Sequence, residues 1–180
     1  MKDTKYNDIF LARISEIERC LEERCYFAAL TLSLTLPDIC GLAEYPELKG
    51  KVGQRYIQWY DQYVGAYEKS DSPYSADMPY LSGEVVYNLR NSFLHSGNPN
   101  IVRSKVKEER CQIDQFKLIL DDSLLGDTSC VSYGAEMQIR ERRYEVNVRM
   151  FCMKLYKTAK GYYLQNKEKF DFFEYSLSVR

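Results

Sequence analysis

His95 is the only histidine in this chain of 180 residues, and it lies five positions after Arg90 in the stretch "NLRNSFLHSG". Imidazole is well suited to moving protons near neutral pH, and guanidinium presents a planar fork that matches phosphate oxygens. Asn91 follows the arginine directly, and its amide can hydrogen-bond the imidazole and fix its tautomer. Together these residue types suit general acid-base chemistry at a phosphate. Spacing alone also allows another interpretation, in which His95 contacts helix carbonyls and Arg90 lies on a solvated flank.

A helix predicted over residues 80–97 carries these side chains, and Gly97 and Pro99 should end it. Steps of 100° per residue separate an apolar side from a polar stripe, which consists of Glu84, Asn88, Asn91 and His95. His95 should therefore face away from the core side of its own helix. Arg90 lies about 140° around the helix axis from His95. We therefore expect the long side chain of Arg90 to reach the same substrate as His95, or the Arg90 of a second subunit to do so.

Three further residues are candidates for supporting roles, namely Asp38, Glu84 and Tyr87. Either carboxylate could orient a histidine or an arginine. A turn aspartate after proline and a first-turn glutamate favoured by the helix dipole would explain the same residues without a site. Of the 16 tyrosines, most fall on apolar helical faces, as Tyr56 and Tyr60 do, and we expect these to be core residues. Tyr87 lies beside the polar stripe and remains a candidate.

A basic cluster, Arg103, Lys105 and Lys107, follows the motif helix. It could hold an RNA backbone, or it could be a solvated loop. The chain as a whole has a formal net charge of -1, which excludes a general basic field for attracting polyanions. Any polyanionic partner must therefore be recognised locally.

Hydrophobic periodicity predicts a mainly α protein, a helical bundle formed by one domain over residues 1–180. The expected helices are an amphipathic one near residues 10–21, a buried one over 25–34 that Pro37 and Asp38 break, a tyrosine-rich one over 52–67, and a long one over 148–163. Alternation near residues 116–120 and 137–139 predicts a small β-hairpin insertion, about 109–141, before the last helix. The intervening "LGDTSCVSYG" should be its loop. The aromatic C-terminus, residues 170–180, should dock on the core or on a second subunit.

The six cysteines include no C-x-x-C pair, so we expect no metal site and no cofactor. Cys20, Cys25 and Cys152 fall within apolar helical patterns, where reduced cysteine behaves as a small hydrophobe. We expect no apolar run to approach the roughly 18 to 20 residues that span a bilayer, and the N-terminal "MKDTKYNDIF" lacks a signal-peptide core. These features favour a cytoplasmic protein without a membrane segment.

The segment "RNSFLH", residues 90–95, resembles the R-x4-6-H motif of the HEPN superfamily, including its polar residue directly after the arginine. The ordered set "TLPDICG" (35–41), "GQRYIQWYDQYV" (53–64) and "LSGEVVYNLRNSFLHSG" (81–97) is similar to a bacterial and plasmid-borne branch of that superfamily. The similarity extends loosely over most of the chain. The hairpin at 109–141 departs from the minimal helical pattern of the family.

The resemblance implies a homodimeric helical bundle in which two copies of the motif face one groove. It implies a metal-independent endoribonuclease with Arg90, Asn91 and His95 as its active residues, in which the ribose 2′-hydroxyl attacks the adjacent phosphorus. Its partners would be RNA, a second copy of the chain and an antitoxin or regulatory protein, in a toxin or defence role. The alternative is a non-catalytic HEPN-like module that binds a nucleotide, RNA or a protein.

Overall fold

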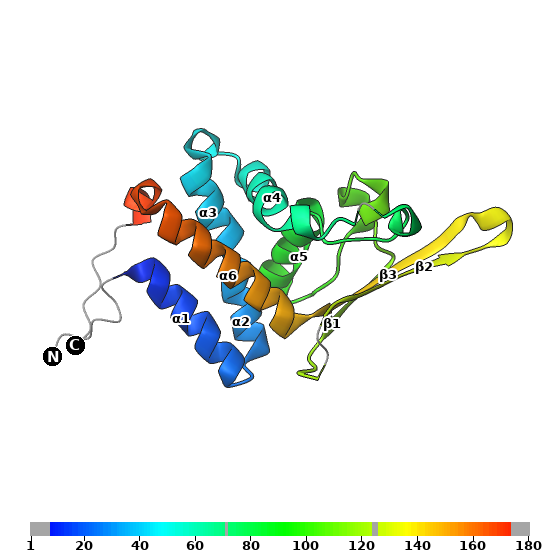
Figure 1. Cartoon of the computed structure of the whole chain (residues 1–180), viewed down its shortest axis with the longest axis horizontal. Helices are drawn as coiled ribbons and strands as arrows, with labels where there is room; N and C mark the ends of the chain where they lie inside the picture. The colour runs from blue at the N-terminus through cyan, green and yellow to red at the C-terminus, as the bar shows by residue number, and fades with distance from the viewer. Residues whose placement is uncertain (1–7, 71, 124–125, 174–180) are drawn as a thin grey trace.

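The computed structural model describes residues 8–70, 72–123 and 126–173 (Figure 1). The fold is mainly helical with a small three-stranded sheet, as the sequence predicts in outline. Its α-helices are α1 (Ile9–Glu22), α2 (Tyr26–Ser33), α3 (Leu36–Glu44), α4 (Val52–Tyr63), α5 (Gly83–Ser96) and α6 (Val148–Gln165). The last helix, α6, packs against α1, α2 and α3, so the end of the chain closes the bundle that the N-terminal helices begin (Figure 1).

Helix boundaries near the N-terminus follow from local chemistry. The Asp8 carboxylate accepts the backbone N–H of Leu11 at 3.0 Å and caps α1. Between α2 and α3 the helix is interrupted at residues 34–35, and Pro37 stands in the first turn of α3. Proline lacks the N–H that an uninterrupted helix would need at that position. The predicted break at Pro37 is therefore confirmed, whereas Asp38 lies inside α3 and does not break it.

Helix α2 is not buried all round, contrary to expectation. Ala29, Leu30 and Ser33 are buried. Its other side, the exposed α2 face, consists of Phe27, Ala28 and Thr31, with 59% of Phe27 exposed. A helix that is apolar on every side has no hydrophobic asymmetry, so its sequence cannot reveal which face the bundle covers.

One stretch, Tyr26–Glu44, is long and apolar enough to cross a membrane by length and composition alone. Its 19 residues have a mean hydropathy of 1.4, and half of the apolar window is buried inside the protein. The stretch is longer than the apolar runs expected from the sequence. Core helices meet the same criterion, so it is weak evidence for a membrane span.

Helices α4 and α5 approach each other closely at the start of α5. A Cβ atom added to Gly83 would lie 2.7 Å from the carbonyl oxygen of Ile57. Asp61 of α4 accepts the backbone N–H of Gly83 at 2.6 Å, and Ser82 provides the N-cap of α5. The absence of a side chain at position 83 therefore allows α4 to position the helix that carries Arg90 and His95.

The sheet differs from the predicted hairpin. Its strands are β1 (Gln115–Ile119), β2 (Thr128–Tyr133) and β3 (Ile139–Asn147), in the order β1-β3-β2. Strand β2 pairs antiparallel with β3 and forms the arm that projects from the helices, whereas β1 pairs parallel with β3 (Figure 1). The predicted pairing of residues 116–120 with 137–139 in a hairpin was wrong, and so was the assignment of 128–133 to a loop.

The physical reason lies in the composition of β2. Thr128, Val131 and Tyr133 are residue types that pack well on a pleated surface. Gly126, Asp127 and the serines around them are typical of turns and concealed this preference. Strand β3 then leads directly into α6, whose N-cap is Asn147, with its side-chain oxygen accepting the N–H of Met150 at 2.9 Å.

The C-terminal aromatic segment docks on the core where the structure describes it. The ring of Phe170 lies 5.1 Å from that of Phe10 and 4.9 Å from that of Tyr163. This confirms the core-docking alternative for Phe170, while residues 174–180 lie outside the described residues.

The cysteines are all free thiols. Cys152 is buried, and burial raises the pKa of its thiol to about 12. Cys20 is half-buried, whereas Cys25 is exposed at the start of α2. The expectation that Cys25 would be a core residue was therefore wrong, because it precedes the helix and lies in the turn after α1.

Candidate functional site

Helix α5 ends where the sequence predicts. Gly97 adopts a left-handed conformation with φ of 65°, and its N–H bonds the carbonyl of Phe93 at 3.0 Å. A glycine accepts this conformation without steric cost and closes the helix. His95 therefore lies in the last turn of α5, where its side chain is exposed.

Arg90 is fixed by its neighbour in the sequence. Its Nη1 donates to the Oδ1 of Asn91 at 2.8 Å. Its Nε atom is buried and has no hydrogen-bond partner among the residues that the structure describes. Burial raises the pKa of the Tyr56 hydroxyl, and the positive charge of Arg90 opposes that rise, so the guanidinium lies near this core tyrosine. Arg90 is therefore half-buried, which differs from the solvated flank that its spacing alone also allowed.

His95 has no hydrogen bond or ion pair within the described part of the chain. The expected bond from Asn91 to the imidazole is not formed, because the Asn91 oxygen accepts from Arg90 instead. Asn91 therefore orients the cation, and the imidazole is free to meet a substrate or a second subunit.

The polar stripe is only partly solvent-facing. Asn88 is 5% exposed and donates through Nδ2 to the carbonyl of Val102 at 3.1 Å. One turn earlier, Oε2 of Glu84 accepts the backbone N–H of Lys107 at 2.7 Å. The segment 101–107 thus covers the first half of the stripe. Helical spacing could not predict that residues 101–107 would bury this part of the stripe, because the segment lies outside the helix.

A pocket of about 270 Å³ lies between α5 and this covering segment, and we call it the lysine pocket. It is lined by Ile57, Glu84, Tyr87, Asn88, Asn91, Lys105 and Lys107. Three of the predicted site residues are therefore brought together, and Arg90 is bonded to one of them. The basic cluster is divided, because Arg103 instead forms an ion pair with Asp114.

Tyr87 forms an aromatic wall of the lysine pocket. Its ring centroid lies 5.2 Å from that of Tyr56. A Cβ atom added to Gly53 would lie 3.0 Å from Cε1 of the Tyr87 ring, so α4 approaches this ring through a glycine. The ring is held on one side by the core and lines the pocket on another.

Asp38 lies elsewhere and has a partner of its own. Its Oδ1 accepts from both Nε and Nη2 of Arg55 at 2.8 Å. Arg55 is buried, and it also donates to the carbonyls of Leu48 and Lys49. Asp38 therefore joins α3 to α4 and to the turn between them, and it does not line the lysine pocket.

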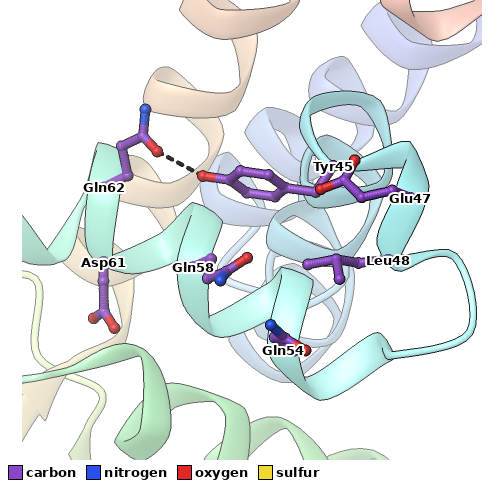
Figure 2. Close-up of a pocket in the computed structure, with 7 residues that line it drawn as sticks. All are labelled: Tyr45, Glu47, Leu48, Gln54, Gln58, Asp61 and Gln62. Carbon is purple, nitrogen blue, oxygen red and sulfur yellow. Dashed lines mark hydrogen bonds between the residues drawn. The ribbon is translucent and has the colours of Figure 1, made fainter.

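A larger pocket of about 710 Å³ opens between α4 and the end of α3 (Figure 2). It is lined by Tyr45, Glu47, Leu48, Gln54, Gln58, Asp61 and Gln62, and the Tyr45 hydroxyl donates to Gln62 at 2.5 Å. Two carboxylates and no cationic side chain line it, so its charge disfavours a phosphate. None of the site residues predicted from the sequence contributes to it.

Within the described residues, no group of three or more histidine, cysteine, aspartate or glutamate side chains is arranged to hold a metal ion. The lysine pocket instead gathers two amides and two lysines beside Tyr87 and Glu84, Arg90 is bonded to Asn91 at its edge, and His95 lies one turn further along α5. These groups can bind an anion and transfer a proton.

The chain matches no family model, no curated protein and no solved structure. The fold therefore defines its class only as a mainly helical protein with a small three-stranded sheet.

Proposed function

We propose that this protein is a metal-independent endoribonuclease of the HEPN type, with a site shared across a homodimer. The observation that carries the proposal is the 2.8 Å bond from Arg90 to Asn91, beside an exposed His95 and a lysine-lined pocket. This combination supplies a fixed cation, a proton-transfer group and room for a phosphodiester chain.

The reaction would be a transesterification within the RNA backbone. The 2′-oxygen forms a bond to the adjacent phosphorus while the bond from phosphorus to the 5′-oxygen breaks. One imidazole accepts the 2′-hydroxyl proton, a second, protonated imidazole donates to the leaving oxygen, and Arg90 stabilises the charge on the phosphoryl oxygens. The products are a 2′,3′-cyclic phosphate and a 5′-hydroxyl.

This chemistry is the reason for proposing a dimer. A single imidazole cannot be base and acid at the same instant, and each chain has one histidine. The exposed α2 face supports a second copy as the occupant, because it is continuous with the motif helix: the Phe27 and Phe93 rings lie 6.1 Å apart. Two-fold symmetry through this region would bring two motif helices together.

The biological setting belongs to the same proposal and rests on the HEPN resemblance. The protein would act in the cytoplasm as a toxin or a defence effector and cleave RNA. An antitoxin or a regulatory protein would restrain it.

A second function, a non-catalytic module that binds nucleotide, RNA or a protein, is favoured by one observation. Among the described residues, no hydrogen bond joins Arg90 to His95 within a chain. The two functions are separated by incubating purified protein with single-stranded RNA in excess EDTA. Cleavage supports the nuclease, whereas binding without cleavage supports the module.

A further inference from the structure

We propose that the lysine pocket is a subsite for the nucleotide next to the cleaved bond. Lys105 and Lys107 would hold its phosphate, and its base would lie against Tyr87. This inference rests on the proposed function, since it takes RNA as the ligand. It adds the direction in which the strand leaves the motif, which is along α5 from His95 toward Glu84.

The two lysines are available for an anion. Both are exposed and line the pocket, and neither has an ion-pair partner among the described residues. Arg103, two residues before Lys105, provides the contrast, because Asp114 already neutralises it. Unpaired ammonium groups beside a pocket are suited to phosphate and require no existing ion pair to be broken.

The segment that carries the lysines is held in place before any ligand arrives. Val106 between them is 1% exposed, and its carbonyl accepts from Nε2 of Gln112 at 2.9 Å. Glu84 holds the backbone N–H of Lys107 at 2.7 Å, and Asn88 holds the carbonyl of Val102. The backbone below the lysines is thus pre-organised, which reduces the entropic cost of binding.

The pocket has the size and the walls for one unpaired base. Its volume of about 270 Å³ lies below the roughly 300 to 1,000 Å³ of pockets that bury a drug-sized ligand, which suits a single base rather than a larger group. The Tyr87 ring and the apolar Ile57 side chain supply a surface on which a base can stack. The subsite therefore selects single-stranded RNA.

The charges in the pocket orient the nucleotide. Glu84 places a carboxylate among its lining residues, and this repels a phosphate from that wall. The phosphate then lies at the exposed ammonium ends of Lys105 and Lys107, away from the Glu84 carboxylate at the Lys107 backbone. One oxygen of Glu84 is engaged by the backbone of Lys107, and Asn91 retains an amide nitrogen that can donate to a base.

The test uses a short single-stranded RNA as the probe. Its affinity is measured by fluorescence anisotropy at several salt concentrations, in the His95→Ala background so that the RNA stays intact. The variant is K105A/K107A, and the matched control is K49A/K157A, which removes the same charge from two exposed lysines outside the pocket. The slope of log affinity against log salt should become shallower by about 0.7 for each phosphate that the variant no longer neutralises, and the control should keep the original slope.

A second pair of variants tests the base. Tyr87→Leu keeps an apolar side chain against Tyr56 but removes the stacking surface, and it should weaken binding about tenfold. Tyr74→Leu, at a tyrosine that is 99% exposed outside the pocket, is its control. Melting curves of all variants verify that they fold.

The outcomes distinguish the subsite from the nuclease. Weakened RNA binding in K105A/K107A and Tyr87→Leu, with unchanged controls, supports the subsite. If the wild type cleaves RNA but these variants bind like their controls, the subsite is overturned and the nuclease stands. Binding that depends on the lysines without any cleavage by the wild type would retain the subsite and overturn the nuclease. A wild type that neither binds nor cleaves RNA overturns both.

Discussion

At the scale of single residues, Arg90 gains its position from Asn91, and His95 has no partner that holds it within the described part of the chain. The bond of 2.8 Å between Arg90 and Asn91 fixes a guanidinium whose Nε is already buried. The imidazole lies one turn beyond Asn91, at the exposed end of α5. Positioning and proton transfer are therefore assigned to different residues, and they can be separated by mutation.

The His95→Ala variant should lose about 10² to 10⁴ in cleavage rate, because it removes the proton-transfer group. Its free energy of unfolding should stay within about 0.5 kcal/mol of the wild type, since the side chain is exposed. Ser96→Ala, at the neighbouring exposed position, is the control and should retain activity. An unchanged cleavage rate in His95→Ala would remove His95 from the mechanism.

The Asn91→Ala variant should lower kcat more than it raises KM, because Arg90 keeps its charge but has no acceptor to orient it. We expect a loss of about 10- to 100-fold, the scale of a displaced positioning group. Asn91→Asp restores an acceptor oxygen and should recover part of the rate, whereas Ser92→Ala should behave as wild type. If Asn91→Ala and Asn91→Asp lose activity equally, the orienting role assigned to the Asn91 oxygen fails.

At the scale of elements, the helices could be predicted and their covered faces could not. Periodicity located α1, α4, α5 and α6, and Pro37 and Gly97 marked boundaries that the structure confirms. Strand β2 was missed, because pairing with β3 is a non-local choice that small polar residues conceal.

The candidate site was partly accessible from the sequence. Residue type and spacing made Arg90, Asn91 and His95 candidates, and the HEPN resemblance favoured a site over a purely structural role. Their surroundings could not, because the lysine pocket depends on residues 101–107 folding back over Glu84 and Asn88. The basic residues of that segment indicated a possible anion site. The sequence could not show that Arg103 is paired with Asp114 and that the two lysines are not.

The close approach of α4 to α5 gives a prediction at this scale. Gly83→Ala would place a methyl group 2.7 Å from the Ile57 carbonyl oxygen, so it should reduce the free energy of unfolding by about 1 to 3 kcal/mol. Gly161→Ala adds the same methyl group in α6, where its Cβ would meet no other part of the protein within 4 Å, and should stabilise the protein by about 0.5 to 1 kcal/mol. Denaturant unfolding measures both. Equal stability of the two variants would contradict the tight packing of α4 against α5.

At the scale of the whole molecule, the exposed α2 face meets α5 through Phe93, whose ring lies 6.1 Å from that of Phe27. Phe27→Glu introduces a charge there, so it should convert the proposed dimer into monomers and abolish cleavage at the same protein concentration. The monomer should remain folded, because Phe27 is 59% exposed. Met137→Glu, at a residue that is 74% exposed on the arm, is the control.

Sedimentation measures the mass of each variant, and RNA cleavage is assayed on the same samples. A fully active monomer would contradict the shared site. Wild-type protein that stays monomeric and partitions onto lipid vesicles through Phe27 would assign the exposed α2 face to a membrane instead.

In the proposed mechanism, His95 and Arg90 drive transesterification of RNA without a metal ion. The most direct test is end-group analysis of labelled RNA after incubation in EDTA with wild-type protein and with His95→Ala. We expect fragments that end in 2′,3′-cyclic phosphates and begin with 5′-hydroxyls, formed by the wild type and not by the variant. Fragments with 3′-hydroxyl ends, cleavage that requires added Mg²⁺, or equal cleavage by His95→Ala would contradict this mechanism.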